Sequence, residues 1–277
     1  MAKTWLITGT SRGFGRDLAK AVLARGDNLV ATARRPADLS FVGDNDRGRV
    51  FQLDVTDATA ARSAVQFAVT EFGALDVVVN NAGYANSAPI EEMSDTDFRN
   101  QIETNFFGLV NVTRAALPVL RQQRGGVFVQ FSSVGGRVGG TPGLGAYQSA
   151  KFAVEGFSEV LANEVQPFGV KVLIVEPGAF RTDWQGSSMQ LPSVGADYEH
   201  TVGAVNRYRR ENDGTQPGDP ARAANVIIDV VESDDPPRRL LLGAGAVEMA
   251  HKSSVERAAE ADKWATTSRA ADFPAGL

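Results

Sequence analysis

The sequence predicts an α/β fold: one domain on a doubly wound parallel sheet of about seven strands, with helices on both faces. Three observations predict it. Short apolar runs alternate with longer stretches of helical periodicity, a glycine-rich turn joins the first run to the first helix, and no repeat or low-complexity segment interrupts the order. With 277 residues, 43% of them hydrophobic, the chain can bury a sizeable core.

Seven apolar runs are expected to form the strands. Because they alternate with helical stretches along the chain, the sheet should be parallel and covered on both faces. The expected strands are 4–8, 28–33, 50–55, 75–80, 127–132, 171–176 and 239–242.

Helical periodicity appears directly after the first strand and again after the third. Phe14, Leu18 and Val22 recur at helical spacing, and Gly26 stands where that helix should stop. Alanine, valine and phenylalanine recur in the same way over 58–72. We therefore expect a helix in each of these segments.

Two further helices begin at capping sequences. Ser94 and Asp97 have the spacing of an N-terminal capping box before a long helix that runs towards Gln123. Asp219, followed directly by a proline, supplies a cap and a first-turn residue for a helix over about 220–232.

Composition excludes several classes of function. The net charge of −5 and the isoelectric point near 5.2 argue against binding to nucleic acid or to an anionic membrane, because both require a cationic surface. A small-molecule substrate fits better. The first strand is expected from Thr4 and no run approaches 18 apolar residues, so we expect no signal segment, no membrane span and a cytoplasmic location.

The rarity of cysteine and histidine excludes further chemistry. No cysteine is present, so disulfides, thiolate catalysis and cysteine metal sites are excluded, and with only His200 and His251 we expect no metal site. A Ser-His-Asp hydrolase would need one of these histidines as its base, yet the chain has no Gly-x-Ser-x-Gly sequence.

The turn after the first strand has the composition of a phosphate-binding loop. Gly9, Gly13 and Gly15 permit positive φ and close approach of the backbone, and the following helix offers free N–H groups to a pyrophosphate. The spacing differs from Gly-x-Gly-x-x-Gly. No Lys-Ser or Lys-Thr follows Gly15, which disfavours a nucleoside triphosphate loop.

Tyr147 and Lys151 are four residues apart, so their side chains share one face if the segment is a helix. Alone, this spacing also fits a half-exposed tyrosine beside a solvated lysine. A phenol with a pKa near 10 exchanges protons poorly at neutral pH. A nearby ammonium favours the phenolate and lowers that pKa. The pair therefore suits a tyrosine that acts as an acid-base catalyst.

Taken together, six ordered motifs resemble those of the classical short-chain dehydrogenases/reductases. They are Thr8-Gly9-x-x-x-Gly13-x-Gly15, Asn80-Asn81-Ala82-Gly83, Asn105, Ser132-Ser133, Tyr147-x-x-x-Lys151 and Pro177-Gly178-x-x-x-Thr182. The resemblance is dense over residues 3 to about 182 and looser to about 245. It implies a Rossmann-type fold and an NAD(P)(H)-dependent oxidoreductase that interconverts a ketone or aldehyde with an alcohol.

The resemblance also assigns catalytic roles. Tyr147 would donate the proton, and Lys151 would hold the pKa of the phenol down and bind the nicotinamide ribose. Ser133 would bind the substrate oxygen, with Ser132 as its rival, because the separation from Ser133 to Tyr147 is one residue longer than in many family members. Asn105 would hold a distortion of its helix and a water that relays protons to Lys151.

The end of the second strand decides the choice of cofactor. An NAD site places Asp or Glu there, whereas this chain has Arg34 and Arg35. Guanidinium groups suit a 2′-phosphate, and Arg12 in the glycine turn would add another. NADP(H) is therefore expected, with NAD(H) as the alternative. In the plainer interpretation, Arg34 and Arg35 are an ordinary solvated pair.

The resemblance places the remaining cofactor contacts along the strand ends. Asp54 and Val55 would contact adenine, although Asp54 would alternatively cap the next helix. Residues 81–83 would lie against the adenosine ribose, and 177–182 would embrace the nicotinamide. The full expected set is Gly9, Ser11, Arg12, Gly13, Phe14, Gly15, Arg34, Arg35, Asp54, Val55, Asn81, Ala82, Gly83, Tyr147, Lys151, Pro177, Gly178, Phe180 and Thr182.

These motifs define the expected domain organisation. An NADP(H)-binding catalytic domain should span 1–245, and a polar, alanine-rich tail without an assigned role should span 246–277. Within the domain, 183–217 is the least regular stretch and is expected to be a mobile lid that sets specificity. Its apolar residues have no regular spacing; they are Trp184, Met189, Leu191 and Tyr198.

Two interpretations of function follow. The first is a reductase or dehydrogenase acting on a small carbonyl compound or alcohol, in a family whose members often form homodimers or homotetramers. The second is a catalytically idle NADP(H)-binding regulator on the same fold. The complete set of Asn105, Ser133, Tyr147 and Lys151 favours the enzyme, because a pure binder has no need of it.

Overall fold

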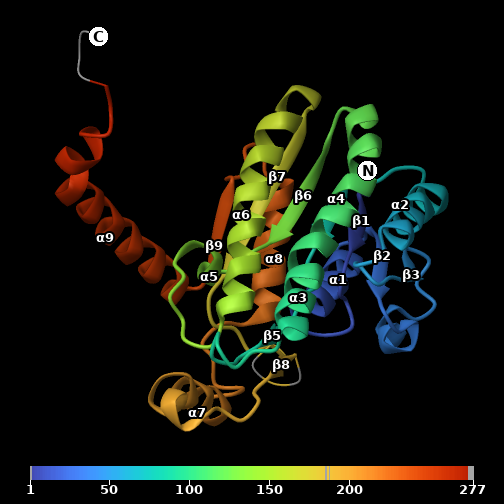
Figure 1. Cartoon of the computed structure of the whole chain (residues 1–277). Helices are drawn as coiled ribbons and strands as arrows, with labels where there is room; N and C mark the ends of the chain where they lie inside the picture. Colours follow the sequence, from blue (N-terminus) through green and yellow to red (C-terminus); the bar gives the residue numbers. More distant parts are fainter. Residues whose placement is uncertain (1, 185, 187, 274–277) are drawn as a thin grey trace.

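Seven parallel strands form the central sheet of the computed structural model, which describes residues 2–184, 186 and 188–273 (Figure 1). They run in the order β3-β2-β1-β4-β6-β7-β9, so the direction of winding reverses between β1 and β4. The strands are β1 (Thr4–Ile7), β2 (Asn28–Ala33), β3 (Gly48–Gln52), β4 (Val77–Asn80), β6 (Gly126–Phe131), β7 (Val170–Pro177) and β9 (Arg239–Leu242). Each overlaps an expected strand, and the predicted fold class is confirmed.

Alternating side chains of the strands enter two separate cores. In β1, Trp5 and Ile7 pack into one core while Leu6 packs into the other, because successive side chains of a strand point to opposite faces. Helices α1 (Gly13–Ala24) and α8 (Pro220–Glu232) cover the first face, and α2 (Ala58–Phe72), α4 (Gly108–Gln123) and α6 (Gly145–Val165) cover the second. The sheet is therefore buried on both sides.

The predicted helix caps are present. The Ser94 hydroxyl accepts a hydrogen bond from the Asp97 N–H at 3.1 Å, and the Asp219 carboxylate accepts from the N–H groups of Ala221 and Arg222 at the start of α8. Gly26 follows the end of α1 with φ of +82°, a conformation that favours glycine.

The helix expected to run from Ser94 to Gln123 is not continuous. It consists of α3 (Asp95–Ile102), a π-helical turn (Glu103–Phe107) and α4. The wider turn places Asn105 at the interruption, and π-turns of this kind occur frequently at functional sites.

The segment 183–217 is more regular than its sequence suggests. Its short strand β8 (Met189–Gln190) pairs with β5 (Ala85–Asn86), and α7 (Ala204–Glu211) lies near its end. Both short strands were missed, because two-residue strands have no recognisable pattern. The other short helices are α5 (Val134–Arg137), the 3₁₀ turns Pro36–Val42, Gln166–Phe168 and Ala196–Tyr198, and the π-turn Glu199–Gly203.

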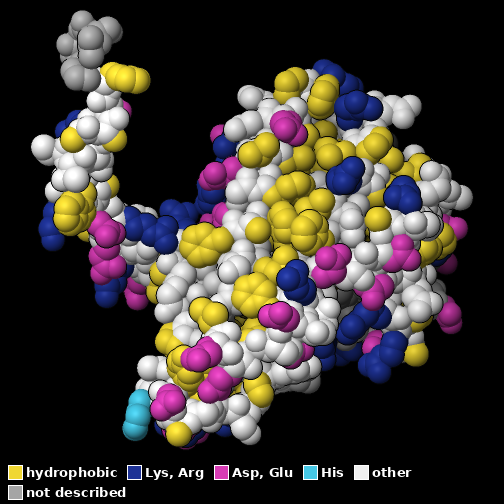
Figure 2. Space-filling model, in the orientation of Figure 1, with side chains coloured by type: hydrophobic (Ala, Val, Ile, Leu, Met, Phe, Trp, Pro, Cys, Tyr) yellow, Lys and Arg dark blue, Asp and Glu magenta, His cyan; other side chains and the backbone are white. Residues whose placement is uncertain are grey.

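The C-terminal segment forms a long helix, α9 (Ala244–Arg269), which stands away from the body of the molecule (Figures 1 and 2). Only Ala246 and Ala250 are buried along it, both near its start. Hydrophobic and charged side chains are mixed on its surface, so it has no pronounced apolar face. Among the described residues, no helix has both the length and the apolar character needed to cross a membrane.

Candidate active site

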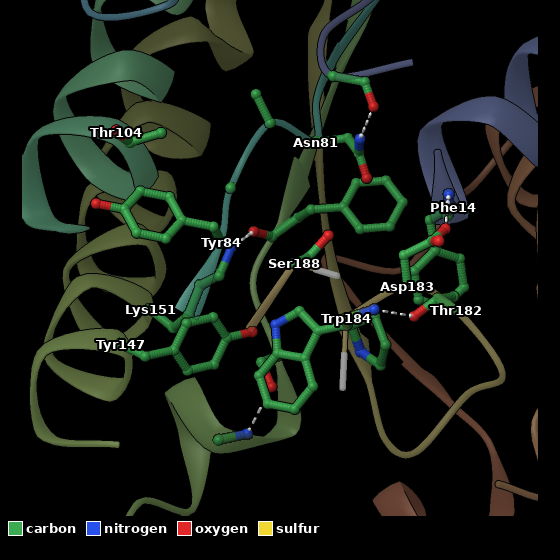
Figure 3. Close-up of a pocket in the computed structure, with 18 of the residues that line it drawn as sticks. Phe14, Asn81, Tyr84, Thr104, Tyr147, Lys151, Thr182, Asp183, Trp184 and Ser188 are labelled. Atoms are coloured by element: carbon green, nitrogen blue, oxygen red, sulfur yellow. Dashed lines mark hydrogen bonds between the residues drawn. The ribbon is translucent and has the colours of Figure 1, made fainter. Parts of the chain in front are cut away.

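A large cavity of about 1010 Å³ opens at the carboxyl ends of the strands. It lies where the winding of the sheet reverses between β1 and β4, which is where doubly wound sheets bind their ligands. Residues from five of the six predicted motifs line it, and Figure 3 shows its central part. Of the predicted site residues, Gly15, Arg35 and Asn105 do not line the cavity.

The glycine turn has the shape expected of a phosphate cradle. Gly9 and Gly13 have φ values of +70° and +55°, and a Cβ on Gly9 would lie 2.8 Å from the Cα of Ala82. Gly15 contributes by close packing, because a Cβ there would collide with the side-chain amide of Asn81 and the carbonyl oxygen of Gly9. The backbone is thus held close to the cavity wall.

Asn81 fixes this turn against the end of β4. Its Nδ2 donates to the carbonyl oxygens of Thr8 at 2.9 Å and Gly9 at 3.1 Å, and its backbone N–H donates to the Thr8 hydroxyl. The Asn81 side chain therefore stabilises the turn, a structural role that the sequence did not indicate.

A carboxylate of the protein already lies at the amino end of α1. The Gly13 N–H donates to Oδ2 of Asp183 at 3.2 Å. Free N–H groups and the helix dipole attract negative charge at this end. The Asp183 carboxylate thus lies at the helix end where the sequence predicted a pyrophosphate.

The structure separates the two arginines that follow β2. Arg34 lines the cavity, as does Arg12. Arg35 is exposed and forms an ion pair with Asp38 at 3.0 Å, so it lies away from the cavity. Both side chains are exposed, so the interpretation as a solvated pair fits Arg35 and stays an alternative for Arg34.

The alternative role for Asp54 as a helix cap is wrong. Asp57 caps α2, accepting from the N–H groups of Thr59 and Ala60. Asp54 accepts from the N–H and hydroxyl of Thr56 and lines the cavity together with Val55.

Tyr147, Lys151 and Ser133 lie together in the cavity. Tyr147 and Lys151 are one turn apart on α6 and both are buried. Ser133, which follows β6, lies close enough to the Tyr147 phenol to lower its pKa. It also accepts the N–H of Gly135 at 3.0 Å. Ser132 lines the cavity too, but its Oγ has no hydrogen-bond partner among the described residues.

Burial shifts both titrating groups of the pair. It raises the pKa of Tyr147 to about 12, against the smaller lowering effect of Ser133, and lowers the pKa of Lys151 to about 8. The Lys151 ammonium donates to the carbonyl oxygen of Phe131 at 2.6 Å and lies 5.7 Å from the centroid of the Tyr147 ring. The expectation of a lowered phenol pKa is therefore wrong for this arrangement, because desolvation exceeds the lowering effect of Ser133.

Asn105 supports the site from behind the cavity wall. Its side chain accepts from the Tyr84 N–H at 2.9 Å and donates to the Tyr84 carbonyl oxygen at 2.8 Å. A Cβ on Gly83 would lie 2.9 Å from Asn105 Oδ1, so the adjacent glycine makes room for it. The predicted helix distortion at Asn105 is confirmed, while the water relay to Lys151 stays a prediction.

Aromatic side chains line the cavity around Phe180 and around Tyr147. Phe180 packs on Phe14 with 5.0 Å between ring centroids, close to Pro177, Gly178 and Thr182. Trp184 lies beside the phenol of Tyr147, with 5.2 Å between centroids (Figure 3). Trp184 therefore covers part of the tyrosine.

Several lining residues were absent from the predicted set. Tyr84 directly follows the motif Asn80-Asn81-Ala82-Gly83, so its position next to a known site was a usable signal. Asn86 and Arg209 gave no such signal, because tertiary packing alone brings them to the cavity. No group of three or more potential metal ligands occurs among the described residues.

The sheet, the glycine turn and the position of the cavity define a doubly wound α/β protein with a large cavity at its topological switch point. Comparisons with known proteins refine this class. The family described as short chain dehydrogenase matches residues 3–191. The chain therefore belongs to the short-chain dehydrogenase/reductase family, whose members are oxidoreductases.

Individual relatives agree with this assignment. A protein of Botryotinia fuckeliana named Oxidoreductase BOA17 is 49% identical over 267 residues, which cover 95% of this chain and 97% of that protein. The crystal structure of a short-chain dehydrogenase from Streptomyces avermitilis is 39% identical with a TM-score of 0.92, covering 99% of this chain and 100% of that chain. A short chain dehydrogenase from Burkholderia cenocepacia in complex with NADP is 25% identical with a TM-score of 0.74, covering 95% and 97%.

Proposed function

We propose that this chain is an NADP(H)-dependent oxidoreductase that interconverts a ketone or aldehyde with its alcohol, using Tyr147 as general acid and base. One observation carries the proposal. The Tyr147 side chain is buried one helical turn from Lys151, in the cavity that also contains Ser133 and the glycine turn.

The residues present fit a nicotinamide dinucleotide. The glycine turn and the amino end of α1 would hold the pyrophosphate, and the cationic Arg12 and Arg34 would hold a 2′-phosphate. The NADP complex of the Burkholderia relative supports this choice, with NAD(H) as the alternative. A bound reduced nicotinamide would supply the hydride.

The protein's own groups would manage the proton. Negative charge develops on the carbonyl oxygen during reduction, so a donor must lie beside it. Because burial raises the pKa of Tyr147 to about 12, its phenol keeps its proton at neutral pH and can donate it. Ser133 would orient the substrate oxygen, and Lys151 would supply positive charge.

A panel of ketones, aldehydes and alcohols tests the proposal directly. Turnover is followed at the NADPH absorbance band, with NADH as the parallel control. We expect carbonyl-dependent oxidation of NADPH. Tight NADPH binding without turnover of any compound would instead favour the idle regulator.

A further inference from the structure

Arg209 is a buried cation in the wall of the active-site cavity. It lies on α7, within the 183–217 segment, and is 4% exposed. Its neighbours Arg207 and Arg210 are exposed, so the helix turns one of three arginines inward. The cavity that Arg209 lines is the one that contains Tyr147.

Neutral groups hold the guanidinium in place. Nη1 donates to the Ser87 hydroxyl at 2.6 Å and to Asn206 Oδ1 at 3.1 Å. Ser87 and Asn206 also bond to each other, through Ser87 Oγ to Asn206 Oδ1 at 2.6 Å and Asn206 Nδ2 to the Ser87 carbonyl oxygen at 3.2 Å. Within the described part of the chain, Nε and Nη2 make no hydrogen bond, so donors of the planar fork stay available.

No carboxylate neutralises this charge among the described residues. Burial lowers the pKa of Arg209 to about 10, and no acidic neighbour opposes that effect. By contrast, the partly buried guanidinium of Arg239 has acidic partners, because it pairs with Glu155, Glu159 and Glu176. A buried charge without an opposite charge beside it is strongly unfavourable, so the absence of an acidic partner for Arg209 among the described residues calls for an explanation.

A second polar group in the same wall lacks a partner. Asn86 precedes Ser87 in the sequence and lines the cavity, and its buried Oδ1 accepts no hydrogen bond from the described residues. Apolar side chains, among them Leu144 and Trp184, surround Tyr147. The cavity thus combines an apolar region near Tyr147 with the Arg209 cation, which has no acidic partner among the described residues, and with the Asn86 Oδ1, which accepts no hydrogen bond from them.

We propose that the substrate carries an anionic group, which Arg209 binds while Tyr147 meets the carbonyl or alcohol group. The inference rests on the proposed function and deepens it: the substrate class becomes oxo acids and hydroxy acids, or their phosphate counterparts. Guanidinium forks bind carboxylate and phosphate through two parallel hydrogen bonds, which matches the unused donors of Arg209. Ser87 and Asn206 are positioning residues that hold the fork.

Matched substrate pairs test the inference. Oxo acids of increasing chain length are compared with their methyl esters, and a second arm uses carbonyl compounds that carry a phosphate monoester. We expect kcat/KM for the anion to exceed that for the ester by about tenfold or more at the best length. Preference in the carboxylate arm or in the phosphate arm identifies the source of the negative charge. Equal kcat/KM within every pair would overturn the inference.

Variants then attribute the preference to Arg209. Arg209→Met should bring the acid-to-ester ratio close to one, mainly through KM for the acid, and Arg209→Lys should retain part of the preference. Arg210→Met is the matched control, because it removes one positive charge from the same helix at an exposed position. Thermal unfolding and NADPH binding verify that each variant folds. If Arg209→Met does not fold, Arg209→Lys and the wild-type ratios still decide.

Calorimetry separates this inference from the proposed function. Saturated carboxylates of the same chain lengths are titrated into the wild-type protein and Arg209→Met with NADP⁺ present. Binding that depends on Arg209, without turnover of any carbonyl compound, would support the anion site and contradict the proposed reaction. Equal turnover of acids and esters, with Arg209→Met lowering both alike, would support the reaction and contradict the anion site. Arg209 would then only connect α7 to the Ser87 segment through its hydrogen bond.

Discussion

Tyr147 shows how burial selects one role for a titrating group. A phenol with a pKa of about 12 is protonated across the physiological range, which is the form that the proposed carbonyl reduction needs. Alcohol oxidation needs the deprotonated form. We therefore expect the reductive reaction to depend little on pH near neutrality, whereas the oxidative reaction should accelerate as the solution becomes alkaline.

Tyr147→Phe tests the donor directly. The change removes one oxygen from a buried ring, so folding and NADPH binding should survive while kcat falls by about 10²–10⁴, the contribution of general acid-base catalysis. Steady-state rates and a thermal melt measure both. Tyr198→Phe, which removes a phenol hydrogen-bonded to Glu91 outside the cavity, is the control. Near-normal turnover by Tyr147→Phe would remove the catalytic assignment.

Arg34 and Arg35 form a natural pair for testing cofactor choice. Arg34 lines the cavity and Arg35 pairs with Asp38 outside it. Each charge-assisted contact to a 2′-phosphate contributes about 1.5–3 kcal/mol, so the wild type should prefer NADPH over NADH by about tenfold or more in kcat/KM. Arg34→Asp should reverse this preference and Arg35→Asp should leave it. Equal use of NADH by the wild type would contradict the prediction.

At the scale of elements, local sequence patterns did not predict the π-turn or the regular structure within 183–217. Strands and capped helices were predicted because apolar spacing and caps such as Ser94 are local signals. Asn105 interrupts a helix whose flanking residues have ordinary helical spacing, so only the resemblance pointed to it. Arg209 is one of three similar arginines, and the packing of α7 alone decides which of them is buried.

Trp184 gives the 183–217 segment a testable role. It packs beside Tyr147, against a cluster that includes Leu144 and Met189, so it should contact the substrate rather than the adenine end of the cofactor. Trp184→Ala should change KM across a ketone series while NADPH affinity stays nearly unchanged. Trp264→Ala, on the exposed part of α9, is the matched control. Full protection of this segment from hydrogen exchange without substrate would argue against a mobile lid.

At the scale of the molecule, Glu176 connects several elements through buried charge. It lies on β7, fully buried, near Arg239 of β9, Arg137 of α5 and Glu155 of α6. Burial, followed by the Glu155 carboxylate, raises the pKa of Glu176 from 4.5 to about 7, against the opposing effect of the two arginines. The folded protein therefore holds a proton at this site that the unfolded chain releases at lower pH.

This difference predicts the sign of a pH effect on stability. Between pH 4.5 and about 7 the folded state binds more protons than the unfolded state, so the free energy of unfolding should fall as pH rises through this window. Glu176→Gln should flatten that part of the profile, as measured by urea unfolding at several pH values. The exposed Glu260→Gln is the control. Parallel profiles for the wild type and Glu176→Gln would contradict the prediction.

The hydrogen bond between Gly13 and Asp183 has a kinetic consequence. Under the proposed function, a pyrophosphate at the amino end of α1 would compete with Asp183 for the Gly13 N–H. Asp183 adjoins Trp184, which packs against Tyr147. Displacement of the carboxylate by the first ligand would therefore uncover the tyrosine for the second. We expect a compulsory order of addition with the nucleotide leading, visible in product-inhibition patterns. Asp183→Asn removes the negative charge of the side chain that accepts from the Gly13 N–H. The nucleotide should therefore associate faster, and the order of addition should become less strict.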